Sequence, residues 1–252
     1  MSAISLHTLR HDRALLLGCL ALAIVLSWWY LVRMAGGMSG MDAPMPFQPW
    51  ATFTMWMVMM VGMMLPGAAP GILMFAAARP QDSPGASLPY LFALGYLLAW
   101  VGYSALATTT QWGLHTLGLL TSSQALSGQA LNDSILAGLL LIAAGAFQWT
   151  PLKHACLYRC RSPLGMVAEG FPANRVRALR AGTLLGLYCA GCCWALMALM
   201  FIGGLMSLAW MALITLVILL EKVVSPWQHL ANGLGLALVA YGGWLLFMGL
   251  SV

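Results

Sequence analysis

The side chains of this sequence that are best suited to chemistry are those that carry sulfur, 18 methionines and 6 cysteines among 252 residues. Thiolate and thioether sulfur are soft ligands, and they favour Cu(I) over harder ions. Most of these residues fall into four groups, each with helical spacing or in a short connecting segment. The sequence therefore suggests a soft-metal site. The alternative for each group is that its side chains only pack in the core.

The densest group is Cys189, Cys192, Cys193 and Met197. Residues three or four apart share a helix face, so the three thiols and the thioether lie on one side of one helix. Counted from Gly182, Cys192 is about ten residues into an apolar stretch, roughly 15 Å along a helix axis. Cysteine is often a small buried hydrophobe, but packing explains three cysteines in five positions poorly. We therefore assign these four residues as candidate metal ligands.

A second pair of thiols, Cys156 and Cys160, has i, i+4 spacing if the chain there is helical. The segment 153–161 is rich in basic residues, and neighbouring positive charge favours the thiolate, which is the ligating form. A basic membrane anchor with two incidental cysteines explains the segment equally well. Both cysteines are candidate ligands, and His154 is a secondary one.

A run of methionines occupies the second apolar stretch. Met59 and Met63 share one helix face, and Met60 and Met64 lie on the adjacent one. Pro66 follows, and proline within a helix leaves a backbone carbonyl without its usual donor. Adaptable packing is the stronger explanation for the stripe taken alone. The four methionines become candidate ligands because a further methionine group directly precedes this stretch.

That further group is Met34, Met38, Met41 and Met45, spaced three or four apart among Gly, Ser, Ala and Pro. Thioether sulfur has no proton to lose and is a suitable ligand for Cu(I) on an oxidising side of a membrane. Apolar filler next to a membrane is the alternative. Met38 and Met41 are taken as secondary candidate ligands.

The composition places these groups in a membrane protein. Hydrophobic residues make up 62% of the chain and charged residues 7%, whereas a soluble domain has about a quarter of its residues charged. In lipid, backbone groups must be paired within helices or closed barrels, and the long apolar runs lack the alternation of barrel strands. We therefore expect an all-α fold, a polytopic transmembrane helical bundle that forms a single integral membrane domain.

About seven stretches are long and apolar enough to cross a bilayer as helices. Their approximate bounds are 14–32, 50–78, 88–110, 131–149, 182–202, 205–220 and 230–250. Cytoplasmic segments carry an excess of Lys and Arg, and a cytoplasmic N-terminus places ten of the 11 basic residues inside and only Arg33 outside. We predict a multi-pass protein of a bacterial inner membrane with a periplasmic C-terminus. Its longer connections would be the outer segment 33–49 and a turn-rich inner segment, 150–181.

Other chemistry is largely absent from the sequence. The histidines do not pair between facing helices as a b-type haem requires, no glycine loop has phosphate-binding spacing, and no basic domain suggests nucleic acid. No fixed-period repeat indicates an inverted-repeat transporter. Glu221 is at the inner end of the sixth stretch, beside Lys222, and is a secondary candidate ligand.

Several segments resemble an uncharacterised bacterial family of predicted metal-binding integral membrane proteins, known only as a domain of unknown function. The likeness runs from about residue 50 to 225 and is carried by Met55–Pro66, Gly95-Tyr96 to Trp100, Gln111-Trp112, Pro151–Lys153 with Cys156-Leu157, Cys160–Pro163, Gly191–Met197 and Glu221-Lys222. The resemblance implies a membrane protein that binds metal. It also makes the matching positions, Glu221 and Lys222 included, the ones to test.

The leading hypothesis is an inner-membrane protein that binds a transition metal ion, with Cu(I) favoured, and acts in its transport or delivery. The expected partners are the lipid bilayer, a metal chaperone or a metalloenzyme under assembly, and further copies of the chain. One alternative is a thiol–disulfide oxidoreductase that uses a quinone, with Cys189 and Cys192 as the redox pair. Another is an assembly or structural subunit of a membrane complex, in which small residues such as Gly203 and Gly242 form helix contacts.

Overall fold

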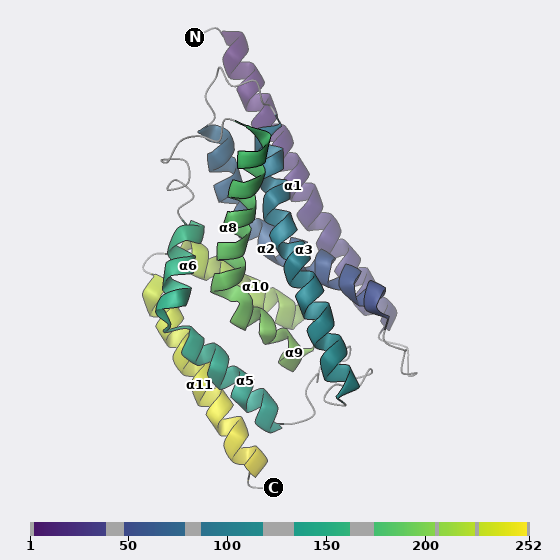
Figure 1. The fold of residues 1–252 in the computed structure, drawn as a ribbon, viewed down its shortest axis with the longest axis vertical. Coiled ribbons are helices and arrows are strands. Elements are labelled where there is room, and N and C mark those ends of the chain that lie inside the picture. The colour runs from purple at the N-terminus through teal and green to yellow at the C-terminus, as the bar shows by residue number, and fades with distance from the viewer. Residues whose placement is uncertain are drawn as a thin grey trace.

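A computed structural model describes residues 3–38, 48–78, 87–117, 134–161, 174–204, 207–224 and 227–250 of the chain, and every regular element in these ranges is an α-helix (Figure 1). The helices are α1 (Ala3–Met38), α2 (Pro49–Ala77), α3 (Leu88–Thr116), α5 (Ser134–Phe147), α6 (Pro151–Arg161), α8 (Arg175–Ala198), α9 (Met200–Gly203), α10 (Leu208–Val223) and α11 (Trp227–Leu250). The expected all-α fold is confirmed.

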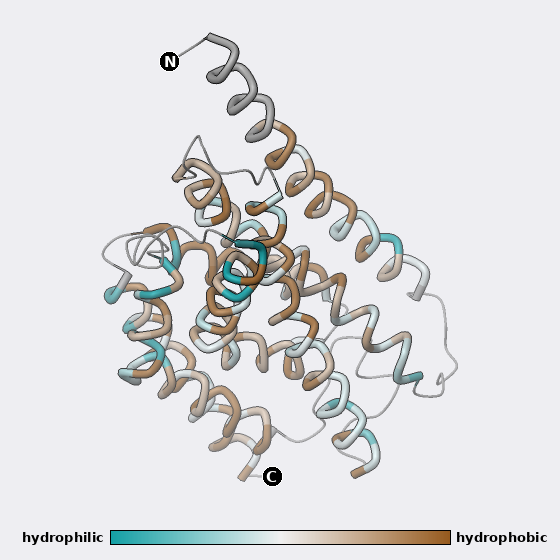
Figure 2. The backbone as a smooth tube through the Cα atoms, turned by 45° about the horizontal axis from the view of Figure 1, so that its top comes forward, coloured by the Kyte–Doolittle hydropathy of each residue, from teal (hydrophilic) through white to brown (hydrophobic). Residues whose placement is uncertain are grey.

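In the part of the chain that the structure describes, five helical stretches are long and apolar enough to cross a membrane, and most of their length is white or brown in Figure 2. They are Ala14–Gly37, Pro49–Ala77, Leu88–Thr116, Arg175–Gly203 and Gln228–Leu250. Helices α5 and α6 together make a sixth candidate, bent by 63° at their junction. The seven spans and their orientation stay predictions.

The predicted inner connection at 150–181 is largely helical where the structure describes it. Helix α6 starts at Pro151. Proline is favoured at the first position of a helix, because an N–H there would have no partner within the helix. Helix α8 starts at Arg175, seven residues before the predicted span, and Asn174 caps it by accepting a hydrogen bond from Arg177 N (2.8 Å). Cys156 and Cys160 therefore lie on one helix.

The first helix is also longer than predicted. Helix α1 continues to Met38, so the first part of the predicted outer connection, from Arg33 onward, is helical. Met41 lies outside the described residues, as does the side chain of Met38.

Helices α3 and α8 lie against each other at almost backbone contact, and glycines make this approach feasible. A Cβ atom at Gly182 would collide with the backbone carbonyl of Phe92, and one at Gly186 would lie 2.8 Å from the carbonyl oxygen of Tyr96. Gly95 fits equally closely against the backbone of α8. This crossing places Tyr96 next to the cysteine segment of α8.

Glycines also allow α5 and α11 to pack closely along each other. A Cβ atom at Gly242 would lie 2.7 Å from the carbonyl oxygen of Gly138, and one at Gly145 would lie 2.7 Å from that of Gly235. Gly242 therefore makes a helix contact within the chain.

The proline at position 66 lies inside α2, which continues through it. The carbonyl of Gly62 lacks the N–H that residue 66 would otherwise donate. The indole Nε1 of Trp28 donates to this carbonyl instead, at 3.1 Å. The carbonyl of Gly62, left without a donor by Pro66, thus links α2 to α1 through a hydrogen bond.

Candidate metal centre

The three cysteines of α8 face the protein interior. Cys189, Cys192 and Cys193 are each at most 3% exposed. The thiols of Cys192 and Cys193 donate to the carbonyl oxygen of Cys189, at 3.1 and 2.9 Å. Such local bonds to the preceding turn fix the direction of each side chain. The three thiols are therefore packed against protein.

Helix α6 adds a fourth thiol. The Cys160 side chain lies next to those of Cys189 and Cys192, and the Cys189 side chain lies next to that of Cys193. We refer to Cys160, Cys189, Cys192 and Cys193 as the thiol cluster. Residues almost 30 positions apart in the sequence meet here because α6 packs along α8.

Helix α2 brings thioether sulfur to the thiol cluster. Met64 Sδ lies 3.8 Å from Cys193 Sγ, and Met64 is completely buried. The other candidate methionines of α2 and α8 are at most 2% exposed, and they are Met59, Met60, Met63 and Met197. Buried sulfur atoms therefore extend from the thiol cluster along the buried face of α2.

Two further side chains that the sequence did not single out as ligands contact Cys189. The Tyr96 hydroxyl lies 3.1 Å from Cys189 Sγ and donates to the carbonyl oxygen of Met64 (3.2 Å). Lys222 Nζ donates to Cys189 Sγ at 3.0 Å. Both residues belong to the segments of resemblance noted above, Gly95-Tyr96 and Glu221-Lys222. The resemblance to the family therefore singled out both positions, but the sequence did not reveal that these side chains contact a thiol.

A buried ion pair holds the end of α10 against α6. Lys153 Nζ donates to both carboxylate oxygens of Glu221, at 2.7 and 2.8 Å, and to the side-chain oxygen of Gln148. Lys153 is fully buried and Glu221 is 3% exposed. Glu221 was a secondary candidate ligand, and its carboxylate is instead bound to Lys153. The pair fixes the position from which Lys222 reaches Cys189.

Of the remaining candidates, Cys156 lies beside the cysteine segment of α8 and His154 lies near the junction of α5 and α6. Cys156 packs over Gly191, where an added Cβ would lie 3.0 Å from its Sγ. His154 Nε2 is 3.3 Å from the backbone oxygen of Gln148. Of the two cysteines in α6, Cys160 is the one that joins the thiol cluster.

The side chains of the described residues do not form a ready-made site of three or more Cys, His, Asp or Glu ligands. The cluster thiols lie next to one another, and those of Cys192 and Cys193 donate to the Cys189 carbonyl. Cu(I) is also bound by two sulfur atoms and accepts thioether ligands. The contact of Cys193 with Met64, and that of Cys160 with Cys189, bring two such sulfur pairs together across helices.

Comparison with protein families gives a match that covers most of the chain. The family model PpoB2, described as a copper chaperone, matches residues 53–245. These residues contain all four cysteines of the thiol cluster, Met64, Tyr96 and Lys222. No curated protein and no solved structure matches the chain.

Proposed function

The chain belongs to the PpoB2 family of copper chaperones, and we propose that it is an inner-membrane protein that binds Cu(I) at the thiol cluster and delivers it to an acceptor. Copper is the cargo of this protein. The proposal is supported above all by the meeting of thiol and thioether sulfur from α2, α6 and α8 in a buried region.

The order of ligands along the buried sulfur atoms supports movement of the ion through the protein. Thioethers bind Cu(I) without losing a proton, whereas thiols must be deprotonated and then bind more tightly. We propose that Cys160, Cys189 and Cys193 hold Cu(I) and exchange it with Met64 and its neighbours on α2. Each step replaces one sulfur ligand by another, so the copper stays as Cu(I).

Lys222 supplies the charge that such a site requires. Two thiolates and one Cu(I) ion carry a net charge of −1, and an uncompensated charge in a buried site is costly. Lys222 Nζ, 3.0 Å from Cys189 Sγ, neutralises this charge. The Tyr96 hydroxyl, 3.1 Å from Cys189 Sγ, would donate to a Cys189 thiolate by turning its proton away from the Met64 carbonyl.

Copper analysis of the full-length protein in detergent tests the proposal. We expect purified wild-type protein to bind Cu(I) and the variant Cys189→Ser/Cys193→Ser to lose most of it. Cys19→Ser is the matched control, because Cys19 is an exposed thiol on α1. The proposal fails if the double variant folds, as judged by its helical circular dichroism, and binds as much copper as the wild type.

The contact between Cys160 and Cys189 also keeps the redox alternative open, because it brings thiols of two helices together. All described cysteines are free thiols in the structure. A redox titration would show a Cys160–Cys189 disulfide that forms and breaks reversibly if the protein were a thiol–disulfide oxidoreductase. If no thiol pair cycles, neither this one nor the Cys189–Cys192 pair expected from the sequence, the alternative is removed.

A further inference from the structure

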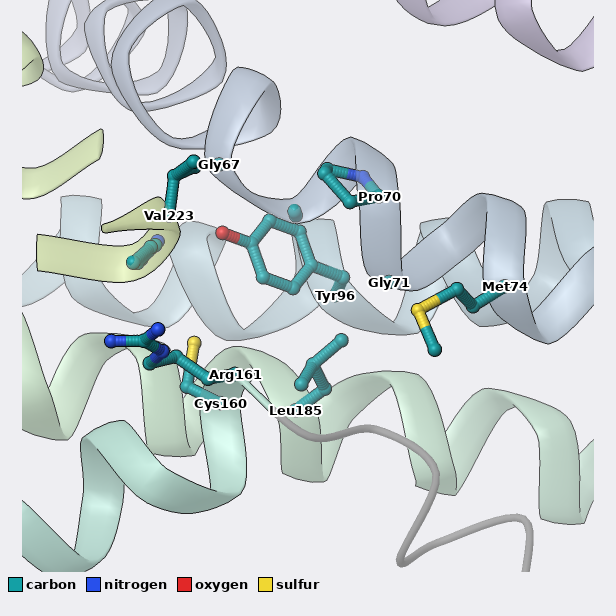
Figure 3. A pocket seen from close by; sticks show the side chains of 11 residues that line it. Gly67, Pro70, Gly71, Met74, Tyr96, Cys160, Arg161, Leu185 and Val223 are labelled. Carbon is teal, nitrogen blue, oxygen red and sulfur yellow. The ribbon is translucent and has the colours of Figure 1, made fainter. Parts of the chain in front are cut away.

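A cavity of about 240 Å³ lies next to the thiol cluster, between the second half of α2, the last turn of α6 and the end of α10. Figure 3 shows the sulfur of Cys160 beside Arg161 on one side of this space, the Tyr96 ring in the middle and Met74 on the other side. Lys222, which contacts Cys189, also lines it. The cavity therefore gives access to the thiol cluster through Cys160.

The size of the cavity exceeds what a bare ion needs. A single water molecule requires only about 10–15 Å³ of such space, and a desolvated metal ion requires no more. The cavity has room for a small organic molecule.

The charge of the cavity wall indicates an anion. Among the residues that the structure describes, the lining side chains include the two cations Arg161 and Lys222 and no carboxylate. Arg161 uses one nitrogen, Nη1, to donate to the backbone oxygens of Glu221 (3.1 Å) and Val224 (2.9 Å). A guanidinium has five donors in a planar fork, so Arg161 keeps donors for a carboxylate of a ligand.

We propose that this cavity binds a small anionic thiol that carries Cu(I), and that the ion enters the thiol cluster from this carrier through Cys160. The inference rests on the proposed function and adds the form in which copper arrives. The carrier carboxylates pair with Arg161, and the carrier sulfur lies against Cys160.

Transfer is a ligand exchange without change of oxidation state. The Cys160 thiol loses its proton as its sulfur bonds to Cu(I), and the carrier sulfur accepts this proton as its own bond to copper breaks. The neutral thiol form of the carrier sulfur then leaves the cavity. Cys189, already in contact with Cys160, becomes the second ligand and gives its own proton to the thiolate of a second carrier molecule.

The test compares two copper donors with the full-length protein in detergent. One donor is the Cu(I) complex of glutathione, an anionic thiol, and the other is the Cu(I) complex of acetonitrile, which is cationic and has no thiol. The rate of loading is followed by the ultraviolet absorption of the Cu(I)–thiolate bonds. The measured quantity is the glutathione rate divided by the acetonitrile rate, which cancels any general loss of folded protein.

We expect Arg161→Gln to lower this ratio about tenfold, within the range by which charge accelerates association. Arg159→Gln is the matched control and leaves the ratio unchanged, because Arg159 lies on the same helix but donates to Tyr188 instead of lining the cavity. An unchanged ratio in Arg161→Gln overturns the inference.

The failure of this inference can be distinguished from failure of the proposed function. A wild-type protein that loads from acetonitrile but not from glutathione still binds copper, and only the carrier is wrong. A wild-type protein that takes copper from neither donor overturns both.

Discussion

Individual residues give the four cluster cysteines different properties. Lys222 donates to Cys189, and within the described part of the chain it is the only cation that donates to a cluster thiol. Cys189 also contacts Tyr96. Cys192 and Cys193 bond to a backbone carbonyl of their own helix. Positive charge next to a thiol favours the thiolate, which is the ligating form. Cys189 is therefore the residue we expect to anchor the ion, with its neighbours as exchangeable second ligands.

Replacing Lys222 tests this assignment. Lys222→Met removes the charge and keeps an unbranched side chain, and hydrogen bonds to charged groups contribute about 1.5–3 kcal/mol. Since about 1.4 kcal/mol corresponds to a factor of ten, we expect Cu(I) affinity to fall at least tenfold. Competition with a coloured Cu(I) chelator measures this affinity. Lys222→Arg, which keeps the charge, should bind more tightly than Lys222→Met, and equal affinities for Lys222→Met and wild type would contradict the assignment.

At the scale of the helices, the crossing of α3 and α8 positions the site. Gly95, Gly182 and Gly186 allow the two backbones to touch, and the cysteine segment of α8 follows directly after this crossing. On the other side of α8, the ion pair of Lys153 and Glu221 locks α6 to α10. Removing one partner of a buried ion pair costs about 3–5 kcal/mol. Tyr96, Cys160 and Lys222 thus reach Cys189 from three helices whose contacts are fixed elsewhere.

A larger side chain at the crossing should separate the helices. Gly182→Leu forces the α8 backbone away from Phe92, and overpacking of this kind costs about 1–3 kcal/mol. We expect a lower melting temperature in detergent together with weaker Cu(I) binding, because Tyr96 moves away from Cys189. The control is Gly102→Leu on α3, where an added Cβ meets nothing within 4 Å. A melting temperature equal to that of this control would show that the close approach is unimportant.

At the scale of the whole molecule, the arrangement of charge relates the site to the two sides of a membrane. Helix α1 begins and α11 ends at opposite ends of the bundle (Figure 1). The cavity beside Cys160 is lined by Arg161 and Lys222, both of which the distribution of basic residues assigns to the cytoplasmic side. Under that orientation copper would meet the cavity from the cytoplasm, where thiols are kept reduced.

Fusion reporters test the orientation. Alkaline phosphatase is active only outside the cytoplasm, so we expect a fusion after Val252 to be active. A fusion at Asp82, in a connection predicted to be cytoplasmic, should be inactive. The reverse pattern would contradict the orientation and place the cavity on the periplasmic side.

The sequence by itself determined the helical class, the apolar stretches and the sulfur groups, because composition and the spacing of residues along one helix are local properties. Cys189, Cys192 and Cys193 share a helix face whatever surrounds them. The sequence did not determine where the helices begin and end. Pro151 is compatible with a turn and with the first residue of a helix, and the packing of α6 against α8 decides for the helix.

Only the tertiary structure decided which groups meet. It selected Cys160 over Cys156, and Met64 over its neighbours, as the residues in contact with the cysteines of α8. It also showed that Glu221 forms an ion pair with Lys153, and that Lys222 donates to Cys189. These contacts depend on the rotation and crossing of helices far apart in the chain. Backbone approaches at glycines and the pairing of buried charges set that geometry, and neither leaves a periodic signal in the sequence.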